Sequence, residues 1–477
     1  MAVDTKHAEY TKNRPKIDIV RDCVEGAQAI KLRTGGGMGS GSELWGMKGT
    51  RYLPPPNPAD TSQENKERYY SYLERANFVN FTGFTLEGMV GMVFRKPPVF
   101  TLPQSIDYLL ENADGNGLSL EQVSQSIVSE LLQAGRDGLL VDYPQTEEGL
   151  TKQQVADRMV RATIKSYKAE SIINWRTITV GSVTMISMVV LCEPTEVVTG
   201  FETKVLDYHR VLFLENGIYK QQLYDENGDM LGDELVPTNN EGSTWKEIPF
   251  VFVGSEENDV NVDKIPLYDI AEINVAHYRN SADYEESSYQ VGQPTPVIWG
   301  LSQSWVNANM KKGVMMGSRR AILLPEGGGA DLLQANPNQM PERGMEQKEQ
   351  QMVNIGARII QDTGRANENV DATNMRNAGQ NSKLSLIVSN TKDALTKCLQ
   401  WSMEYMGSDG EIVLEFNTQF YDKTIDPQTI MAGIQLLDRG VYAKTDLRAN
   451  LRKANMIADD RTDEMLNAES EDVNPII

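Results

Sequence analysis

Apolar residues recur at two different spacings along the chain, and the change of spacing separates helical from strand-forming regions. A spacing of three or four positions, typical of helices, occurs in five stretches: 63–93, 120–135, 267–291, 341–360 and 383–406. Ser119 and Gln122 have the spacing of a capping box before the second stretch, and Pro266 precedes the third. The fifth stretch has one apolar stripe that we expect to be buried: Leu384, Ile387, Val388, Leu395, Leu399 and Met403.

Between the second and third helical stretches the spacing changes to two. This alternation predicts strands over 138–143, 183–191, 208–214, 219–224 and 249–253. Turn-forming residues such as Glu215-Asn216-Gly217 separate them. The pattern therefore predicts an α+β fold with a β-rich module of roughly 120 residues, about the size of one domain.

The remaining regions follow neither spacing over a long run. Residues 1–60 are expected to be irregular, with a glycine tract at 34–42 and a proline-rich element at 54–58. Short strands and turns are expected over 297–340, a polar stretch over 361–382, and one strand over 411–420. Two helices and an acidic tail are expected to follow Asp426-Pro427.

Composition restricts the class of protein. The 477 residues carry 46 Lys and Arg against 67 Asp and Glu, a net charge of −21, and 40% are apolar, as in a folded globular protein. No apolar run approaches the roughly 20 residues of a membrane helix, and the first residues have no apolar core of a secretory signal. The three cysteines, far apart in sequence, indicate a reducing compartment, so we expect a cytoplasmic protein that is not in a membrane.

Sequence motifs for catalysis are missing from the chain. The glycine tract is followed by Glu43 and Leu44, not by the lysine of a phosphate-binding loop, and it favours a flexible linker. His7, His209 and His277 form no zinc-protease motif, and His277 is expected to be a core or interface residue. We expect no cofactor, no metal and no catalytic residue.

The helix predicted over 267–291 is strongly acidic. It carries five carboxylates against the single cation Arg279: Asp269, Glu272, Asp283, Glu285 and Glu286. Two pairs of them are three residues apart and could bind a divalent metal, as in a metal-dependent nuclease, although a solvated acidic face is the simpler interpretation. An acidic surface does not grip DNA, because tight binding requires cations that neutralise phosphates.

Two further segments have an unusual composition. Lys311, Lys312, Arg319 and Arg320 form the one compact basic cluster of the sequence, and either a solvated patch or a docking site for a partner would explain it. The polar stretch 361–382 has few apolar anchors, yet it joins two long predicted helices. Loops of this length are uncommon unless they are functional.

The order of these regions resembles the portal (head-to-tail connector) protein of tailed bacteriophages. The stretch from His277 to Glu285, followed by Gly292-Gln293-Pro294-Thr295-Pro296-Val297, is similar to the passage from stem to clip in an uncharacterised-domain subgroup of portals. Ser171-Ile172-Ile173-Asn174-Trp175-Arg176 is similar to a wing segment of the same subgroup. The resemblance extends over about residues 15–455, and neither the first 60 residues nor the acidic end has a clear counterpart.

The resemblance implies a division into the parts of a portal. These are an N-terminal arm (1–60), a wing (61–264), a stem helix (265–291), a clip (292–340), a returning stem helix (341–360), a tunnel loop (361–382), a tunnel helix with a wing strand (383–424) and a crown with the acidic tail (425–477). It also implies a ring, usually of twelve subunits, at one capsid vertex of the virion. Double-stranded DNA would pass through this ring during packaging and ejection. The implied partners are a terminase motor, a head-tail adaptor, and capsid and scaffold proteins.

The resemblance gives each unusual segment an expected role. The five carboxylates of 267–291 would line the channel, and the basic cluster would dock the motor and the adaptor. The tunnel loop would touch DNA through weak, exchangeable contacts made by Arg365, Asn367, Asn369, Asn374, Arg376 and Asn377. The alternatives are a metal-dependent nuclease or another connector ring of the virion that is not a portal.

Overall fold

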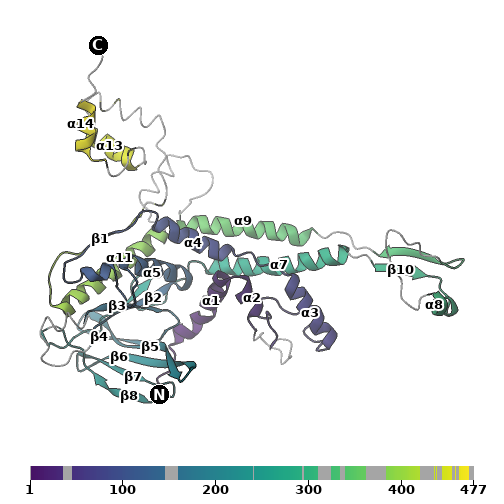
Figure 1. Ribbon diagram of the computed structural model, residues 1–477, viewed down its shortest axis with the longest axis horizontal. Helices are drawn as coiled ribbons and strands as arrows, with labels where there is room; N and C mark the ends of the chain where they lie inside the picture. The colour runs from purple at the N-terminus through teal and green to yellow at the C-terminus, as the bar shows by residue number, and fades with distance from the viewer. Residues whose placement is uncertain are drawn as a thin grey trace, which may run out of the picture. The chain divides into compact units, whose positions relative to one another are not determined.

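The computed structural model describes the following residues: 2–35, 46–144, 160–239, 241–292, 295–309, 324–333, 339–360, 383–418, 443–453 and 461–471, with 420, 435, 437 and 457. The chain divides into two compact units, one of Met1–Gly91 with Val99–Glu415 and one of Met92–Pro98 with Phe416–Ile477. Figure 1 shows the helices and strands. The described residues confirm the predicted α+β class. Among the described helices, none is both long and apolar enough to span a bilayer.

The first 35 residues contain two helices, so the prediction that residues 1–60 are irregular was wrong. Helix α1 (Ala8–Glu25) buries Ile17, Val20 and Cys23, and α2 (Ala27–Leu32) buries Ala29 and Ile30. Gly26, with φ of 101°, breaks the chain between them. The helical spacing is hard to recognise in the sequence because charged residues and Pro15 interrupt it.

The helix predicted over 63–93 is two helices, α3 (Gln63–Arg75) and α4 (Phe81–Val93). Ser62 caps α3 by accepting a hydrogen bond from the Asn65 amide at 3.2 Å. The break falls at residues 76–80, and Asn80 caps the next turn through the Gly83 amide at 2.7 Å. A continuous helix was therefore the wrong prediction here, because the side chain of Asn80 competes with the helical backbone.

The larger unit has its main core around a three-stranded antiparallel sheet. Strands β3 (Thr163–Lys168), β2 (Arg136–Asp142) and β9 (Phe250–Gly254) lie in the order β3-β2-β9. Helix α5 (Leu120–Ala134), which has the predicted capping box at Ser119 and Gln122, packs on this sheet together with α11 (Lys383–Met406). In the stripe predicted for α11 all residues but the half-buried Met403 are fully buried.

The second sheet is a five-stranded antiparallel meander. It consists of β4 (Ile172–Val180), β5 (Val183–Thr199), β6 (Glu202–Glu215), β7 (Ile218–Tyr224) and β8 (Met230–Leu235), in that order. Asn216 and Gly217 both have positive φ in the tight turn between β6 and β7, as their sequence predicts. Among the described residues four strands were not predicted: β1 (Val99–Thr101), β3, β4 and β8.

A pair of long helices leaves these sheets and carries a small insert. Helix α7 (Tyr268–Gly292) is followed by β10 (Thr295–Trp299), α8 (Gln303–Asn309) and β11 (Gly329–Leu333), and α9 (Met340–Ile360) returns alongside α7 (Figure 1). The helices are antiparallel, since Gly344 lies beside Asn280, Glu349 beside His277 and Gly356 beside Ile270. Strands β10 and β11 form an antiparallel pair of their own.

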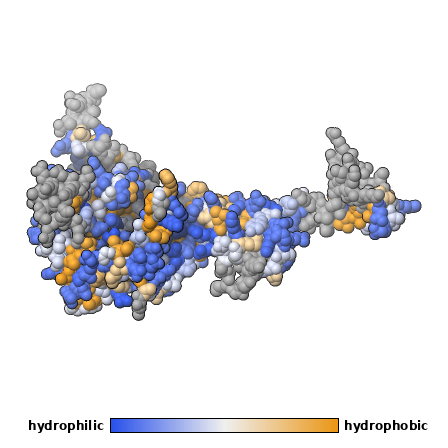
Figure 2. All heavy atoms as spheres, turned by 60° about the horizontal axis from the view of Figure 1, so that its bottom comes forward, coloured by the Kyte–Doolittle hydropathy of each residue, from blue (hydrophilic) through white to orange (hydrophobic). Residues whose placement is uncertain are grey.

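The insert exposes apolar side chains. Val297 is 41% exposed and Trp299 51% exposed. In Figure 2 hydrophilic residues cover much of the visible face, and a patch of apolar residues lies on the insert. A two-stranded sheet is at most marginally stable in isolation, so the insert depends on contacts beyond its two strands.

Several short elements lie outside the two larger sheets and the long helix pair. Strand β1 (Val99–Thr101) pairs with β12 (Val413–Glu415), which is the one regular part, among the described residues, of the strand predicted over 411–420. Residues Asp107–Leu110 form a short 3-10 helix, η2. In the smaller unit, α13 (Lys444–Lys453) and α14 (Asp463–Glu471) fit the two helices predicted near the end of the chain. Arg448 joins them by donating from Nη1 to Asn467 Oδ1 at 2.6 Å.

Candidate functional site on the long acidic helix

The candidate site that the structure describes is the acidic helix α7. The basic cluster Lys311, Lys312, Arg319 and Arg320 lies outside the described residues. So do Arg365, Asn367, Asn369, Asn374, Arg376 and Asn377 of the polar stretch. The roles expected for these two groups remain predictions.

Helix α7 has one buried side and one exposed side. The buried side is made of residues three or four apart: Ile270, Ala271, Asn274, Val275, His277, Tyr278, Ser281 and Ala282. Asp269, Glu272 and Asp283 lie on the opposite, exposed side. Glu285 is two residues beyond Asp283, about 200° further round the helix, and therefore cannot share that side. The five carboxylates thus do not form a single acidic face.

Asp269 and Glu272 lie near the start of α7 and are exposed in the single chain. The Tyr268 hydroxyl donates to Glu272 Oε1 at 2.6 Å, and Lys16 of α1 lies over the Tyr268 ring at 5.8 Å from its centroid. The structure places no cation in an ion pair with either carboxylate among the described residues. This end of the helix therefore presents negative charge that has no ion-pair partner among the described residues.

Asp283 and Glu286 lie further along α7 and contact α3. The Tyr72 hydroxyl donates to Asp283 Oδ1 at 2.7 Å, and burial, followed by this bond to a carboxylate, raises the pKa of Tyr72. Glu286 forms an ion pair with Arg75, whose guanidinium also lies over the Tyr289 ring.

The same two carboxylates line a cleft of about 210 Å³. Its other walls are Pro54, Pro56, Arg68 and Tyr72. Because α3 supplies a hydroxyl and a cation to this end of α7, the acidic charge is partly compensated here. The two ends of the helix therefore differ in the charge that they offer to a neighbour.

The stretch from His277 to Glu285, which carries the resemblance noted above, holds α7 in place. His277 is 3% exposed, its Nε2 lies 3.2 Å from Glu349 Oε1 of α9, and burial lowers its pKa. The expectation of a core or interface histidine is confirmed. Arg279 donates from Nε to the Tyr52 carbonyl at 2.8 Å.

Two polar side chains on the buried side of α7 form hydrogen bonds with residues at and next to the break between α3 and α4. Ser281 accepts from the Asn77 amide at 3.1 Å and donates to the Asn77 carbonyl at 2.6 Å. Asn274, which is fully buried, accepts from the amide and the hydroxyl of Thr82 and donates to the Val79 carbonyl. Sequence spacing did not indicate these residues, because a polar residue on a helix gives no sign that its partner is a backbone group elsewhere in the chain.

The carboxylate pairs do not form a metal centre in the part of the chain that the structure describes. No group of three or more His, Cys, Asp or Glu side chains is close enough together there to hold a metal ion. Asp283 is engaged by a tyrosine and Glu286 by an arginine. The nuclease alternative thus lacks a donor set among these residues.

Comparisons with known proteins give one family match and a set of solved structures that are similar to this chain. The family described as "Domain of unknown function (DUF4055)" matches residues 266–406, less than half of the chain. This segment begins just before α7 and ends with the last residue of α11. The comparison with curated proteins finds no match.

One of the similar solved structures is a chain from the neck of an empty GTA particle computed with C6 symmetry. It is 14% identical, the match covers 80% of this chain and 92% of that chain, and the TM-score is 0.39.

Proposed function

We propose that this chain is a structural subunit of a phage-like particle, and that it forms the portal ring at one capsid vertex. The observation that carries the proposal is the unit α7, insert, α9 and α11. An antiparallel helix pair projects from the sheets with a small insert, and the chain then returns to a core helix. This is the order of stem, clip, returning stem and tunnel helix in portals, and the family match has nearly the same bounds.

The charge of the helix pair supports the proposal in physical terms. Asp269 and Glu272 are exposed and have no ion-pair partner among the described residues, so a wall that they line would repel phosphates. DNA that the wall does not bind tightly can slide through the channel. In the proposed ring Asp269, Glu272 and Asp283 face the channel together, whereas Glu285 points to the other side of α7.

The proposal also gives roles to the two segments outside the described residues. The basic cluster from Lys311 to Arg320 would bind the packaging motor and later an adaptor through salt-dependent contacts. The stretch 361–382 would enter the channel and touch DNA transiently. Both roles follow from the resemblance to portals.

Electron microscopy of the purified full-length chain in negative stain tests the proposal. We expect closed rings with an axial hole, and a mass by light scattering equal to a whole multiple of 53.3 kDa. A monomer at every concentration, in low and high salt, would contradict a self-assembling portal. Hydrolysis of DNA in the presence of Mg²⁺ or Mn²⁺ would favour the nuclease alternative.

A further inference from the structure

The residues before α1 form a strap across the edge of the five-stranded sheet. We call residues 3–7 the N-terminal strap. The His7 amide donates to the Ile173 carbonyl of β4 at 2.9 Å, and Asn174 Nδ2 donates to the Thr5 carbonyl at 2.8 Å. At the other end, Val3 lies at the β7–β8 turn, 3.7 Å from the position of a Cβ on Gly228. Since β4 is the first strand of this sheet and β7 the fourth, the strap binds the edge strand at Ile173 and Asn174 and runs from there to the far end of the sheet.

His7 joins the strap to α1 and to the sheet at once. Its Nδ1 accepts a hydrogen bond from the Glu9 amide at 3.2 Å, which makes His7 the N-cap of α1. Its ring stacks on Trp175 of β4, with centroids 4.0 Å apart and an angle of 23° between the planes. The cap requires a lone pair on Nδ1, and therefore this nitrogen must be unprotonated.

The same tryptophan also contacts a buried cation. The Arg136 guanidinium lies 4.1 Å from the centroid of the Trp175 ring and 3.7 Å from that of Phe252, and Arg136 is 3% exposed. Nη2 donates to the Val260 carbonyl at 3.2 Å, whereas Nε and Nη1 have no hydrogen-bond partner among the described residues. Burial lowers the pKa of Arg136 to about 9, so it is still charged at neutral pH.

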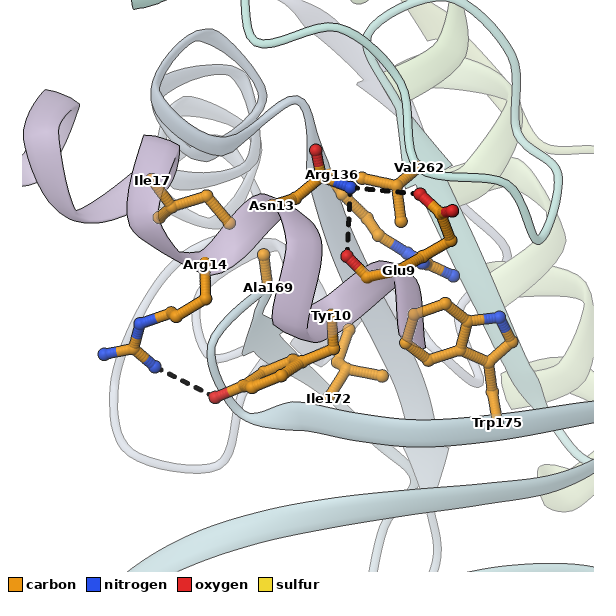
Figure 3. Close-up of a pocket in the computed structure, with 10 residues that line it drawn as sticks. All are labelled: Glu9, Tyr10, Asn13, Arg14, Ile17, Arg136, Ala169, Ile172, Trp175 and Val262. Carbon is orange, nitrogen blue, oxygen red and sulfur yellow. Dashed lines mark hydrogen bonds between the residues drawn. The ribbon is translucent and has the colours of Figure 1, made fainter. Parts of the chain in front are cut away.

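Few negative groups compensate this cation. Asp259 and Asp263 act on Arg136 from a distance without an ion pair among the described residues, and the carboxylate of Glu9 lies on the wall of the same small cavity. The cavity measures about 20 Å³, room for one water molecule. Figure 3 shows Glu9, Arg136 and Trp175 around it, with Asn13 of α1 bound to Glu9.

A proton on His7 would therefore act against the strap in two ways. It would occupy Nδ1 and remove the cap of α1, and it would add a positive charge near Arg136. Burial and Arg136 lower the pKa of His7, in that order, while Glu9 opposes them. Since the free side chain has a pKa of about 6.5, the released strap binds the proton more tightly than the bound strap does.

We propose that the N-terminal strap is a latch that acid releases, with His7 as the residue that senses the proton. In the released state residues 3–7 and the first turn of α1 leave β4, and the backbone at Ile173 and the side chain of Asn174 become free. This inference concerns the monomer and holds whether or not the chain forms a portal ring.

Hydrogen–deuterium exchange of the full-length protein at pH 7.5, 6.5, 5.5 and 5.0 tests the latch. The readout is the protection of a peptide covering residues 2–12, corrected for intrinsic exchange with a synthetic peptide of the same sequence. We expect the opening equilibrium constant to rise as the pH falls below about 6.5, by at most roughly tenfold per pH unit, and to level off below the pKa of bound His7. Protection that does not change between pH 7.5 and 5.0 would overturn the proposal.

Two variants separate His7 from other acid effects. His7→Asn keeps a side-chain oxygen that can cap α1 but cannot titrate. Protection of residues 2–12 from exchange should therefore become independent of pH. The loss of the ring stack on Trp175 sets only the degree of that protection. His209→Gln replaces a buried histidine of the same sheet, on β6, and should keep the wild-type response. A pH response that survives in His7→Asn, or that disappears in His209→Gln, would also overturn the proposal.

Discussion

Helices α11 and α9 are similar in length and very different in burial. The 24 residues of α11 include twelve that are buried, among them Leu395, Leu399 and Trp401. Of the 21 residues of α9, those described as buried are Met352, Gly356 and Ile359, all in its second half, and Val353 is 60% exposed. Helix α11 thus has its stabilising contacts within one chain. Helix α9 buries few side chains except against α7. A helix of this kind gains most of its further stability from contacts with neighbouring subunits in an assembly.

The largest expected effect comes from cutting a side chain in α11. Leu395 is fully buried, so Leu395→Ala should lower the free energy of unfolding by about 2–5 kcal/mol, through lost transfer energy and a new cavity. The matched change on α9, Val353→Ala, should cost less than about 0.5 kcal/mol in the single chain. Urea denaturation followed by circular dichroism measures both. Equal losses would mean that α9 is as much a core helix as α11.

The contrast between these helices was only partly visible in the sequence. The ends of α11 and its buried stripe were predicted correctly, because Leu384, Ile387 and Val388 repeat at helical spacing and bury against one sheet. The same spacing also predicted α9, but spacing does not tell whether an apolar residue such as Val353 meets a partner. Strands β3, β4 and β8 were missed because their residues do not alternate simply: Thr177 to Val180 and Met230 to Glu234 are exposed on both faces.

The next largest effect is expected where the helix pair joins the rest of the larger unit. Asn274→Ala would leave the Thr82 amide without its partner inside the protein, and it would remove one of the two hydrogen bonds that the Val79 carbonyl accepts. We expect a loss of about 1–3 kcal/mol, the cost of buried polar groups that lose their hydrogen bonds. Asn280→Ala, at a half-buried position of the same helix, is the control and should change the free energy of unfolding by about 0.5 kcal/mol or less. A control that costs as much as Asn274→Ala would argue against a special role for the junction.

This junction also shows what the sequence could not predict of the candidate site. The five carboxylates were identified by composition, but their separation into an uncompensated pair and a pair engaged by α3 depends on Tyr72 and Arg75, about 200 residues earlier in the chain. No local pattern links residues so far apart. Helical geometry alone, in contrast, separates Glu285 from Asp283, and the prediction that all five carboxylates line the channel did not take this into account.

A buried carboxyl in the sheet core should make the stability of the fold depend on pH. Asp137 is fully buried on β2, and burial, followed by the charge of Glu130, raises its pKa. Since the folded state holds this proton more tightly than the unfolded state, the ionised form destabilises the fold at neutral pH. Asp137→Asn should therefore raise the free energy of unfolding by about 1–2 kcal/mol at pH 7.5.

The gain from Asp137→Asn should disappear as the pH falls toward 4, because Asp137 is then protonated in the unfolded state as well, and folding no longer requires the uptake of a proton. Denaturation of both proteins at a series of pH values gives the difference directly. The matched change on α7 is Asp269→Asn, at an exposed carboxylate, and it should produce less than about 0.5 kcal/mol at any pH in this range. A gain for Asp137→Asn that is the same at pH 7.5 and at pH 4 would contradict the protonation argument.

The smallest effect is expected at the polar contact between α7 and α9. Glu349 is 48% exposed, so its contact with His277 contributes little at neutral pH, where burial keeps the imidazole unprotonated. Glu349→Gln should cost less than about 0.5 kcal/mol at pH 8. At pH 5 the loss should grow to about 0.5–1 kcal/mol, since the lowered pKa of His277 falls further without the carboxylate, and the unfolded state then gains the proton preferentially.

Urea denaturation at the two pH values measures the change, with Glu346→Gln, at an exposed position of α9, as the control. If the loss for Glu349→Gln were the same at pH 5 and at pH 8, His277 and Glu349 would not interact in solution, and α9 would be held against α7 by its buried residues Met352, Gly356 and Ile359 instead.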